Sequence, residues 1–537
     1  MPASCAGGCL WYIRRDSGMG LFQRIFTDER REQCAVLCAG REISYAELRA
    51  ETLRFGRVLH ELRIERGDRV ALLLADSPEF IASFVAVVSS GGIVVPINLA
   101  LPAEQQHFIL NDCGAGVAIL EDSIANALFA GAAVPANLKH LVLISRAAAA
   151  GGLDVAGLDT QLFETTERAR AIDYVFPDAA SDSDDAFILY TSGSTGEPKG
   201  AVHTQADIYY ANETYCHEVL KLREGDRLFS SSRLPFAYGL GNAFTFPLLN
   251  GFTTILCKEK PSPDIVAQIF DDYRPTIFFG VPVVFRMLLD HHREAQALDT
   301  SSLRLCVSAG EALPAQLGQE WEDTFGVTVL DGIGSTEMLH MFMSNHDDDV
   351  RYGSSGKLLR GYEARLIDHE GVATPLGEAG NLWIRGRSAA SRYWNREESS
   401  ARTFVDGWVR TGDLYRCDQE GFWWHMGRSD DCFKSSGQWV SPVEVEGVLL
   451  RSERIRLAAV VEGRDADQLS CVCAFLVMAA GGDAESVEND LRVLCEKALP
   501  RFKQPRRYIF MNELPYTATG KVRRFKLRER LRAETQP

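Results

Sequence analysis

Short apolar runs alternate with stretches of helical periodicity along most of this chain, and this alternation restricts the fold more than any other feature. Helical segments are expected near 282–289 and 313–325. The strand-like runs lie at 70–74, 117–120, 141–144, 276–280, 303–309 and 327–331. Strands that alternate with helices are typical of parallel sheets with helices on their faces. We therefore predict an α/β fold with two such sheets.

The chain is too long for one hydrophobic core, because 537 residues usually divide into at least two domains. Short strands and Trp/Gly-rich turns between about 351 and 427 predict a β-rich subdomain. After Arg428 the chain has strand-like runs of its own at 458–461, 469–477 and 508–510, which are enough for a small α+β domain. The short polar join G-R-S-D-D is predicted to act as a hinge. Residues 1–20 are assigned to an N-terminal tail that is disordered by default.

Charge and composition argue against several classes of function. The net charge of −16 argues against bulk binding of nucleic acid or of an anionic membrane. No apolar run reaches the roughly 18 residues of a membrane span, and the first residues lack the pattern of a secretory signal. The thirteen cysteines include no C-x-x-C pair and the eleven histidines no H-E-x-x-H pair, so a structural metal site is not expected. These features favour a reducing cytoplasm.

The sequence Y-T-S-G-S-T-G-E-P-K-G at 190–200 predicts a loop that binds a polyphosphate. It follows an apolar run at 186–189 that is expected to be a buried strand. Its glycines allow the backbone to close around a ligand, and N–H groups, hydroxyls and the Lys199 ammonium supply donors. Pro and Gly flank this lysine, which distinguishes the loop from a Walker A motif. The candidate nucleotide-binding residues are Thr191, Ser192, Gly193, Ser194, Thr195, Gly196 and Lys199.

A second candidate turn is G-I-G-S-T-E at 332–337. It follows a strand that is expected to end at Asp331, so Thr336 and Glu337 should lie where open α/β sheets bind ligands. A carboxylate beside phosphates needs a cation, so Glu337 suggests Mg²⁺. A charge at a helix N-terminus is the alternative explanation for Glu337.

Three further turns are weak signals when each is taken alone. R-T-G-D-L at 410–414 presents Asp413, which suits vicinal hydroxyls or a local cap. The hinge adds the cation Arg428, and P-Y-T-A-T-G-K at 515–521 presents Lys521, which in isolation would be taken for a surface lysine. The basic stretch after 497 suggests contact with an anion, and a solvated helix face explains part of it equally well.

These five motifs, in this order, resemble those of the adenylate-forming superfamily of acyl- and aryl-CoA synthetases, luciferases and peptide-synthetase adenylation domains. The resemblance extends from about 43 to 531. L-P-F-A-Y-G-L-G-N at 234–242 and D-G-I-G-S-T-E at 331–337 are similar to the benzoate-CoA ligase type, which includes 2-aminobenzoate (anthranilate) ligases. Ile333 stands where much of the superfamily has an aromatic residue against adenine, which weakens a stacking role and agrees with this branch.

The resemblance implies an architecture and a set of site residues. The N-terminal domain, 21–429, would have two parallel-type sheets between helices and a β-barrel-like part, and the mobile C-terminal domain, 430–537, would rotate about Asp430. Lys521, Thr336 and Glu337 would be catalytic, with Mg²⁺ at Glu337. The remaining nucleotide residues would be Gly310, Glu311, Asp331, Gly332, Ile333, Asp413 and Arg428. The acyl pocket would comprise Phe236, Ala237, Tyr238, Gly239, Ala309, Gly332, Gly334 and His340, and coenzyme A would meet Lys434, Ser436, Gly437 and Trp439.

The implied reaction joins a small aromatic carboxylate, benzoate or a substituted benzoate such as anthranilate, to ATP and then to coenzyme A. Lys521 would bridge the carboxylate and the α-phosphate, and small residues beside aromatic walls suit a flat ring. His340 or Tyr238 could bond the carboxylate or a ring substituent, although a histidine already satisfied on a helix is the alternative for His340. Other interpretations are an adenylation enzyme that loads a carrier-protein thiol, a non-catalytic nucleotide-binding protein and a luciferase-type oxidase. The preferred ring substituents, a downstream acyl-transferring synthase or carrier protein, and the choice between monomer and homodimer stay open.

Overall fold

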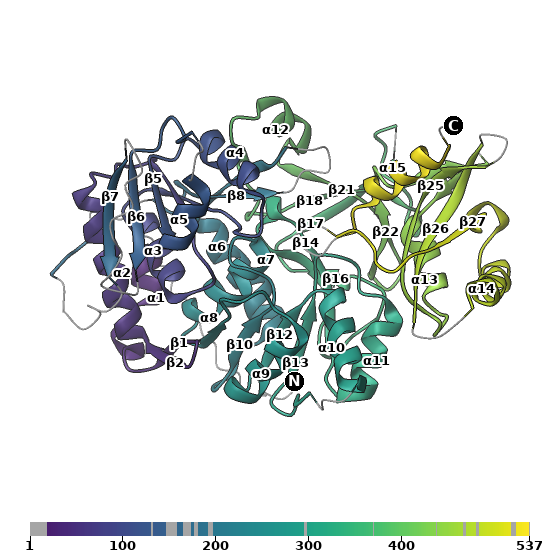
Figure 1. Cartoon of the computed structure of the whole chain (residues 1–537), viewed down its shortest axis with the longest axis horizontal. Coiled ribbons are helices and arrows are strands. Elements are labelled where there is room, and N and C mark those ends of the chain that lie inside the picture. The colour runs from purple at the N-terminus through teal and green to yellow at the C-terminus, as the bar shows by residue number, and fades with distance from the viewer. Residues whose placement is uncertain are drawn as a thin grey trace, which may run out of the picture.

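The computed structural model describes residues 19–129, 133–145, 158–164, 173–176, 181–191, 197–294, 298–368, 370–436, 438–465, 469–479, 483–516 and 522–535. These residues form a large lobe and a smaller lobe, and the smaller one contains the C-terminal part of the chain (Figure 1). The large lobe is built on three sheets, which position most of the predicted site.

The first sheet is mostly parallel and has antiparallel strands at both edges. β14 ends at Gly334, three residues past the predicted end at Asp331, because it turns into antiparallel pairing with β15. A Cβ at Gly332 would lie 2.6 Å from the backbone carbonyl oxygen of Met343, so the antiparallel pairing with β15 requires glycine here. The nine described strands run in the order β16 (Lys357–Leu358), β15 (Met341–Ser344), β14 (Val329–Gly334), β13 (Leu305–Ser308), β12 (Ile277–Gly280), β10 (Arg227–Ser230), β11 (Thr253–Leu256), β1 (Cys34–Cys38) and β2 (Arg41–Ser44).

The second sheet is also parallel except at the edge that carries the predicted phosphate loop. There β8 pairs antiparallel with β9, and β9 pairs antiparallel with β19. The eight described strands run in the order β19 (Arg392–Tyr393), β9 (Lys199–Thr204), β8 (Asp185–Thr191), β4 (Ile93–Pro96), β3 (Arg69–Leu73), β5 (Val117–Glu121), β6 (His140–Ser145) and β7 (Asp159–Glu164).

Helices cover both faces of these sheets. In the chain's order they are α1 (Leu21–Ile25), η1 (Asp28–Arg30), α2 (Tyr45–Glu61), α3 (Pro78–Ser89), α4 (Ala103–Cys113), α5 (Asp122–Phe129), α6 (Gln205–Ala211), η3 (Asn212–Leu220), α7 (Ala237–Leu240), η4 (Gly241–Thr245), α8 (Phe246–Leu249), α9 (Pro263–Tyr273), α10 (Pro282–Glu294), α11 (Ala315–Phe325), η5 (Thr336–Met338) and α12 (Glu397–Thr403). Of these, η3 and η4 are π-helical, a conformation that is frequent at functional sites.

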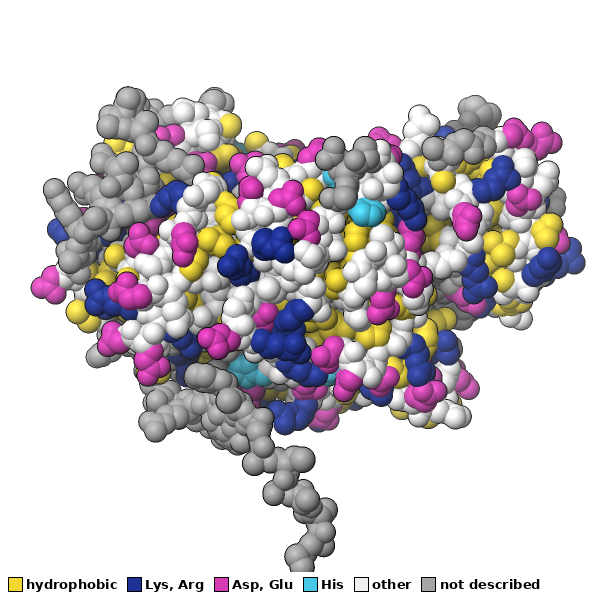
Figure 2. Space-filling view, turned by 90° about the horizontal axis from the view of Figure 1, so that it is seen from below, with side chains coloured by type: hydrophobic (Ala, Val, Ile, Leu, Met, Phe, Trp, Pro, Cys, Tyr) yellow, Lys and Arg dark blue, Asp and Glu magenta, His cyan; other side chains and the backbone are white. Residues whose placement is uncertain are grey.

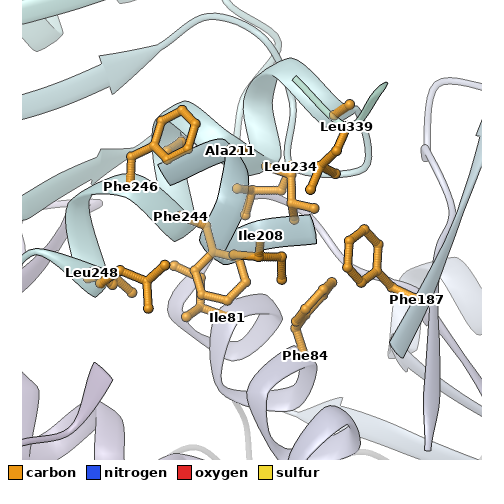
Figure 3. Packing of buried hydrophobic residues seen from close by; sticks show 14 of the residues in the cluster. Ile81, Phe84, Phe187, Ile208, Ala211, Leu234, Phe244, Phe246, Leu248 and Leu339 are labelled. Atoms are coloured by element: carbon orange, nitrogen blue, oxygen red, sulfur yellow. The ribbon is translucent and has the colours of Figure 1, made fainter. Parts of the chain in front are cut away.

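The main core lies between the two sheets. Helix α3 packs within it and is buried and predominantly apolar on all sides, as expected of a helix with no solvent face. Ser77 caps it by accepting the N–H of Phe80, and Pro78 occupies its first turn. Phe84 of this helix lies against Phe187 of β8 and Phe244 of η4, with ring centroids 5.7 and 5.2 Å away (Figure 3). This aromatic packing joins β8 of the second sheet, through α3, to η4, which also contacts β10 and β11 of the first sheet.

The third sheet and the smaller lobe complete the chain. The third sheet is antiparallel and consists of β17 (Glu363–Ile367), β18 (Gly380–Arg385), β21 (Trp408–Cys417), β20 (Phe404–Val405) and β22 (Trp423–Arg428). It occupies the region predicted to be β-rich. The smaller lobe contains β23 (Phe433–Ser435), β24 (Gln438–Val440), α13 (Pro442–Leu449), β25 (Ile455–Arg464), β26 (Ser470–Met478), α14 (Ala484–Ala498), η6 (Arg501–Lys503), β27 (Arg507–Phe510) and α15 (Arg524–Thr535).

The observed architecture agrees with the predicted α/β class, a large N-terminal part with mixed sheets and a small C-terminal part. Among the helices that can be described, none combines the length and the apolar character needed to cross a bilayer. Acidic and basic side chains are interspersed over the face in Figure 2. Part of the basic C-terminal run is paired internally, since Arg524 contacts Glu446 at 2.9 Å and Arg528 contacts Asp431 at 2.9 Å.

Candidate functional site

The predicted site residues of the large lobe follow the carboxyl ends of sheet strands. Thr191 is the last residue of β8, the segment from Ala309 to Glu311 follows β13, and Glu337 follows β14. β13 and β14 are neighbours in the first sheet, and β8 belongs to the second. Loops at the carboxyl ends of strands are where open α/β sheets bind ligands, so the arrangement is that of a ligand site.

Glu337 is held at two points. The phenolic hydroxyl of Tyr393 donates to Oε1 of Glu337 at 2.7 Å, and the N–H of Ala390 donates to its backbone carbonyl at 2.7 Å. One carboxylate oxygen is therefore engaged, and the second is the one that a cation would take. Glu337 does lie in the first turn of η5, but that turn has only three residues and provides little helix dipole.

Thr336 is fixed from the opposite side by a buried histidine. Nε2 of His203 lies 2.7 Å from the carbonyl oxygen of Thr336, and Nδ1 lies 2.9 Å from Oδ2 of Asp207. Asp207 also accepts hydrogen bonds from the backbone and the hydroxyl of Thr204. The ring of His203 stacks on Phe187 with centroids 5.3 Å apart. The Thr336–Glu337 turn is thus anchored to the junction of β9 and α6.

Lys199 approaches the same turn from the phosphate loop. It is the first residue of β9 and pairs with Thr191 of β8, so the two ends of the predicted loop lie side by side. Its Nζ is 5.6 Å from the centroid of the Tyr393 ring. Lys199 and Glu337 therefore both contact Tyr393. The predicted residues Ser192, Gly193, Ser194, Thr195 and Gly196 lie outside the described residues.

Asp413 and Arg428 are brought together by strand pairing. They are directly opposite on β21 and β22, and Nη1 of Arg428 lies 3.2 Å from Oδ1 of Asp413. His425 Nε2 lies 3.7 Å from the same carboxylate oxygen. Gly412 has a φ of +76°, which favours glycine, and the absence of a Cβ there leaves space for the Arg428 guanidinium, which would otherwise lie 2.9 Å from it. The two weak sequence signals thus form one polar unit at the junction with the smaller lobe.

The two lobes meet at Glu311. The N–H of Val522 donates to Oε1 of Glu311 at 3.1 Å, and Tyr516 forms an isolated antiparallel bridge with Val522. The residues on either side of the predicted T-G-K turn therefore lie next to a predicted nucleotide residue. Lys521 itself lies outside the described residues.

The predicted nucleotide residues on and after β13 and β14 are buried or half-buried, or have a backbone conformation that favours glycine. Asp331 is 1% exposed, it accepts the N–H of Leu313 at 3.3 Å, and burial raises its pKa well above the usual range. Ile333 of β14 is half-buried and packs against the main core. Gly310 adopts a φ of +91°, a conformation that favours glycine.

The predicted acyl pocket surrounds His340. Its ring lies near Phe246, Tyr215 and Tyr238, with centroids 4.6, 4.7 and 5.8 Å away. Neither ring nitrogen makes a hydrogen bond of ordinary geometry within the described residues, and burial lowers the pKa of His340 to about 3. His340 precedes β15 and is not on a helix, so the alternative of a satisfied helical histidine is wrong.

A small cavity lies beside this ring and admits about one water molecule. Tyr238 lies against the His340 ring, and its hydroxyl already donates to the carbonyl of Val307 at 3.1 Å. Among the lining residues, His340 and Thr245 carry polar side-chain atoms. Residues lining the cavity are Ile208, Ala211, Ala237, Leu240, Gly241, Thr245, Phe246, Leu339 and His340. Phe236 and Gly239 flank Ala237 and Tyr238 in and before α7.

The predicted coenzyme A residues lie on the β23–β24 hairpin of the smaller lobe. Lys434 and Ser436 are exposed, and Ser436 has a φ of +51°. Gly437 and the side chain of Trp439 lie outside the described residues. Asp430 is exposed in the turn that follows β22, between the two lobes.

Mg²⁺ at Glu337 would depend on the substrate for most of its ligands. The described residues contain no cluster of three or more His, Cys, Asp or Glu side chains that could hold a metal by themselves. Mg²⁺ at nucleotide sites is commonly bound by one or two carboxylates together with substrate phosphates. A single oriented carboxylate at Glu337, opposite the phosphate-loop lysine, fits that mode.

The AMP-binding enzyme family matches residues 24–394, and the C-terminal domain of AMP-binding enzymes matches residues 444–521. The chain belongs to this family. Among curated AMP-binding enzymes, the chain is 42% identical to the benzoate–CoA ligase of Thauera aromatica over 493 residues, which cover 90% of each chain.

Two solved AMP-binding enzymes are also similar over nearly their whole length. A crystal structure of an anthranilate CoA ligase in complex with anthranoyl-AMP has a TM-score of 0.89 and 34% identity, covering 96% of this chain and 98% of that one. A benzoate CoA ligase from Burkholderia xenovorans LB400 has a TM-score of 0.84 and 35% identity, covering 95% of this chain and 100% of that one. The predicted superfamily and its benzoate/anthranilate-CoA ligase type are confirmed.

Sequence reasoning missed the residues that hold the site in place. Tyr393 and His203 contact the Thr336–Glu337 turn but belong to no motif that indicates a ligand site. The position of Tyr393 depends on the pairing of β19 with β9, and that of His203 on the contact of β9 with the turn after β14; both join segments far apart in the sequence. A buried histidine beside a capping aspartate, in H-T-Q-A-D at 203–207, is the one local signal that could have drawn attention to His203.

Proposed function

We propose that this AMP-binding enzyme is an ATP-dependent aryl-CoA ligase that acts on benzoate or a substituted benzoate such as anthranilate. The observation that carries the proposal is that Tyr393 links Glu337 and Lys199 at the carboxyl ends of sheet strands, while the loop after the neighbouring strand β13 carries the Glu311–Val522 contact. Sequence similarity to a benzoate–CoA ligase over 90% of the chain supports the substrate class.

In the first step, a carboxylate oxygen of the aryl acid attacks the α-phosphorus of ATP. A bond forms between that oxygen and phosphorus, the bond to the β-phosphate oxygen breaks, and pyrophosphate leaves. No general base is needed because the acid is already ionised at neutral pH. The residues must instead cancel negative charge, and Lys199 with the loop from Thr191 to Gly196 would hold the phosphates.

Lys521 is proposed to bridge the attacking carboxylate and the α-phosphate. At about 4 Å and an effective dielectric of about 20, such a contact is worth roughly 4 kcal/mol before desolvation costs. Glu337 would hold Mg²⁺, which when bound supplies neutralising charge on the phosphates and on the leaving pyrophosphate. The Asp413–Arg428 unit would bind the ribose hydroxyls, with Arg428 orienting the carboxylate of Asp413.

In the second step, the sulfur of coenzyme A attacks the acyl carbonyl, the thioester bond forms, and AMP leaves while the thiol proton passes to solvent. The proposed acceptor residues, Lys434, Ser436, Gly437 and Trp439, belong to a different part of the smaller lobe from Val522. We therefore propose that domain 430–537 rotates on domain 21–429 about Asp430 between the steps, a rigid-body switch of a common kind.

The acyl pocket favours a flat ring over a long alkyl chain. Its walls are aromatic, and the neutral His340 ring offers a donor or an acceptor to the carboxylate or to a ring substituent. The eleven cysteines in the described residues are free thiols, which agrees with the predicted cytoplasmic location. A downstream synthase or carrier protein, and a monomeric or homodimeric state, remain predictions.

The deciding experiment measures thioester formation with benzoate, anthranilate, hydroxybenzoates, a cinnamate and a fatty acid. We expect pyrophosphate release and a CoA thioester with at least one single-ring acid and none with the fatty acid. Acyl transfer to a holo-carrier protein but not to free coenzyme A would support the carrier-loading alternative. Absence of pyrophosphate release with every acid would overturn the proposal.

A further inference from the structure

Tyr393 contacts two parts of the proposed ATP site at the same time. Its hydroxyl donates to Oε1 of Glu337 at 2.7 Å, and its ring centroid lies 5.6 Å from Nζ of Lys199. Glu337 is the proposed ligand of the metal, and Lys199 is the cation of the phosphate loop. No sequence motif assigns a function to this tyrosine, and strand pairing brings it here by placing Tyr393 opposite Ala201 of β9.

The side chain of Tyr393 has little freedom to move. It is 7% exposed and packs in a small cluster with Ala201, Ala390 and Phe404, whose ring centroid is 5.2 Å away. Its backbone N–H donates to the hydroxyl of Ser400 at 2.9 Å. A tyrosine phenol is protonated at neutral pH, so the hydroxyl of Tyr393 acts as a donor to Glu337. A rigid donor of this kind fixes the orientation of the carboxylate that it contacts.

The consequence for Glu337 is geometric. Its backbone is held by the N–H of Ala390 and its Oε1 by the phenol, so the carboxylate plane cannot turn freely. The second oxygen is then presented as a single, oriented ligand rather than as a bidentate pair. The ring face of Tyr393 attracts the ammonium group of Lys199 through a cation–π contact and so stabilises it near Glu337.

We propose that Tyr393 is a positioning residue that sets the geometry of Glu337 and Lys199 for the metal–triphosphate complex. The inference rests on the proposed function, because it assumes that Mg²⁺ and ATP bind at these two residues. Residues that orient metal ligands typically contribute about 10- to 100-fold to metal affinity or activity. The two contacts of Tyr393 use different atoms, so they can be separated by mutation.

The test measures binding of a fluorescent, non-hydrolysable ATP analogue by the full-length protein, in excess EDTA and in excess Mg²⁺. The ratio of the two dissociation constants is the gain in affinity due to Mg²⁺. Tyr393→Phe keeps the ring and loses only the hydroxyl, so we expect a gain reduced by about 10-fold or more and an unchanged affinity in EDTA. Tyr393→Leu also removes the ring, so we expect it to weaken binding in EDTA as well.

Tyr45→Phe is the matched control, because Tyr45 is equally buried and its hydroxyl donates to the carbonyl of Phe252 at 2.9 Å, away from the site. It should retain the wild-type gain. Glu337→Gln completes a double-mutant cycle: if the phenol acts through Glu337, adding Tyr393→Phe to Glu337→Gln should cause no further loss. The cycle compares dissociation constants of the ATP analogue, which report on the folded protein, so it still decides the question if one variant is less stable.

Three outcomes separate the inference from the proposed function. If Mg²⁺ increases the affinity for the ATP analogue as much in Tyr393→Phe as in wild type, the inference is overturned and the proposed function stays intact. Additive losses of Tyr393→Phe and Glu337→Gln also overturn it, because the phenol would then act independently of Glu337. A wild-type protein that binds no analogue under either condition overturns both the proposed function and the inference.

Discussion

Gly239 provides a direct test of the acyl pocket, because the structure leaves no space for a side chain there. A Cβ at this position would lie 2.1 Å from the carbonyl oxygen of Arg233 and 2.5 Å from that of Ser232. Both atoms are backbone, so no side-chain rotation can relieve the clash. The loop that leads from Ser232 into α7 would have to move by roughly 1 Å to restore ordinary van der Waals contact.

That loop carries Phe236, and α7 carries Tyr238, so Gly239→Ala should displace the pocket wall. A misplacement of about 1 Å near reacting groups can cost about 10²-fold in rate. We therefore expect kcat/KM for benzoate to fall by about 10²-fold, with a loss of stability of about 1–3 kcal/mol from overpacking. Binding of the ATP analogue should change little, because the clash does not involve Glu337 or Lys199.

The assay follows benzoyl-CoA formation against benzoate concentration, alongside analogue binding and thermal unfolding. Gly447→Ala is the matched control: Gly447 lies in α13, and a Cβ there would have no neighbouring atom within 4 Å. That variant should keep full activity and gain up to about 1 kcal/mol in stability. Gly239→Ala with kcat/KM within a few-fold of wild type would refute this account of the pocket, as would an equal loss of nucleotide binding.

Three further predictions concern other parts of the chain. Burial and the neighbouring Glu79 raise the pKa of Glu51 from its ordinary 4.5 to about 8, so the contribution of Glu51 to stability is full below pH 4.5 and is lost as the pH rises towards 8. Glu51→Gln stays neutral and should therefore gain in stability relative to wild type across that pH range, by several kcal/mol at most. Unfolding temperatures of the two proteins that stay parallel from pH 5 to 9 would contradict this. Lys521→Ala should reduce adenylate formation, measured by pyrophosphate exchange, by about 10²–10³-fold. It should leave thioester formation from supplied acyl-AMP, measured by single-turnover transfer, nearly intact. Equal loss of both half-reactions would exclude a role of Lys521 in the first step alone. Because burial keeps His340 neutral, wild type and His340→Gln should show parallel pH profiles of kcat/KM between about pH 5.5 and 8, and an inflection found only in wild type would count against a neutral ring.

Much of the fold could be predicted because its signals are local. The apolar runs at 70–74, 117–120 and 141–144 became β3, β5 and β6, since strands buried on both faces of a parallel sheet need continuous apolar sequence. The helices predicted near 282–289 and 313–325 became α10 and α11. The extension of β14 to Gly334 was not predicted, because it depends on an antiparallel partner that follows later in the chain.

The site was predictable only where a motif carried its own chemistry. Glu337 and Lys199 stood out because a carboxylate and an ammonium next to Gly-rich turns indicate a phosphate site. Tyr393 did not, because a tyrosine in the polar sequence S-R-Y-W-N carries no charge and stands beside no Gly-rich turn. Its relation to Glu337 arises from the register of β19 on β9, which no local pattern encodes.

The contacts around Glu337 also suggest why the catalytic cation is assigned to the smaller lobe. The large lobe holds its charged groups rigidly: Glu337 is tied to Tyr393 and Ala390, Thr336 to His203, and Asp413 to Arg428. A group that must reach the α-phosphate in one step and withdraw in the next cannot be built into such a frame. The proposed rotation puts it on a part that moves, and one of the contacts between the two lobes is the hydrogen bond from Val522 to Glu311. Breaking a hydrogen bond of this kind costs about 0.5–1.5 kcal/mol, or somewhat more when the acceptor is charged, which is small enough to be offset when pyrophosphate leaves and the acyl-AMP stays bound.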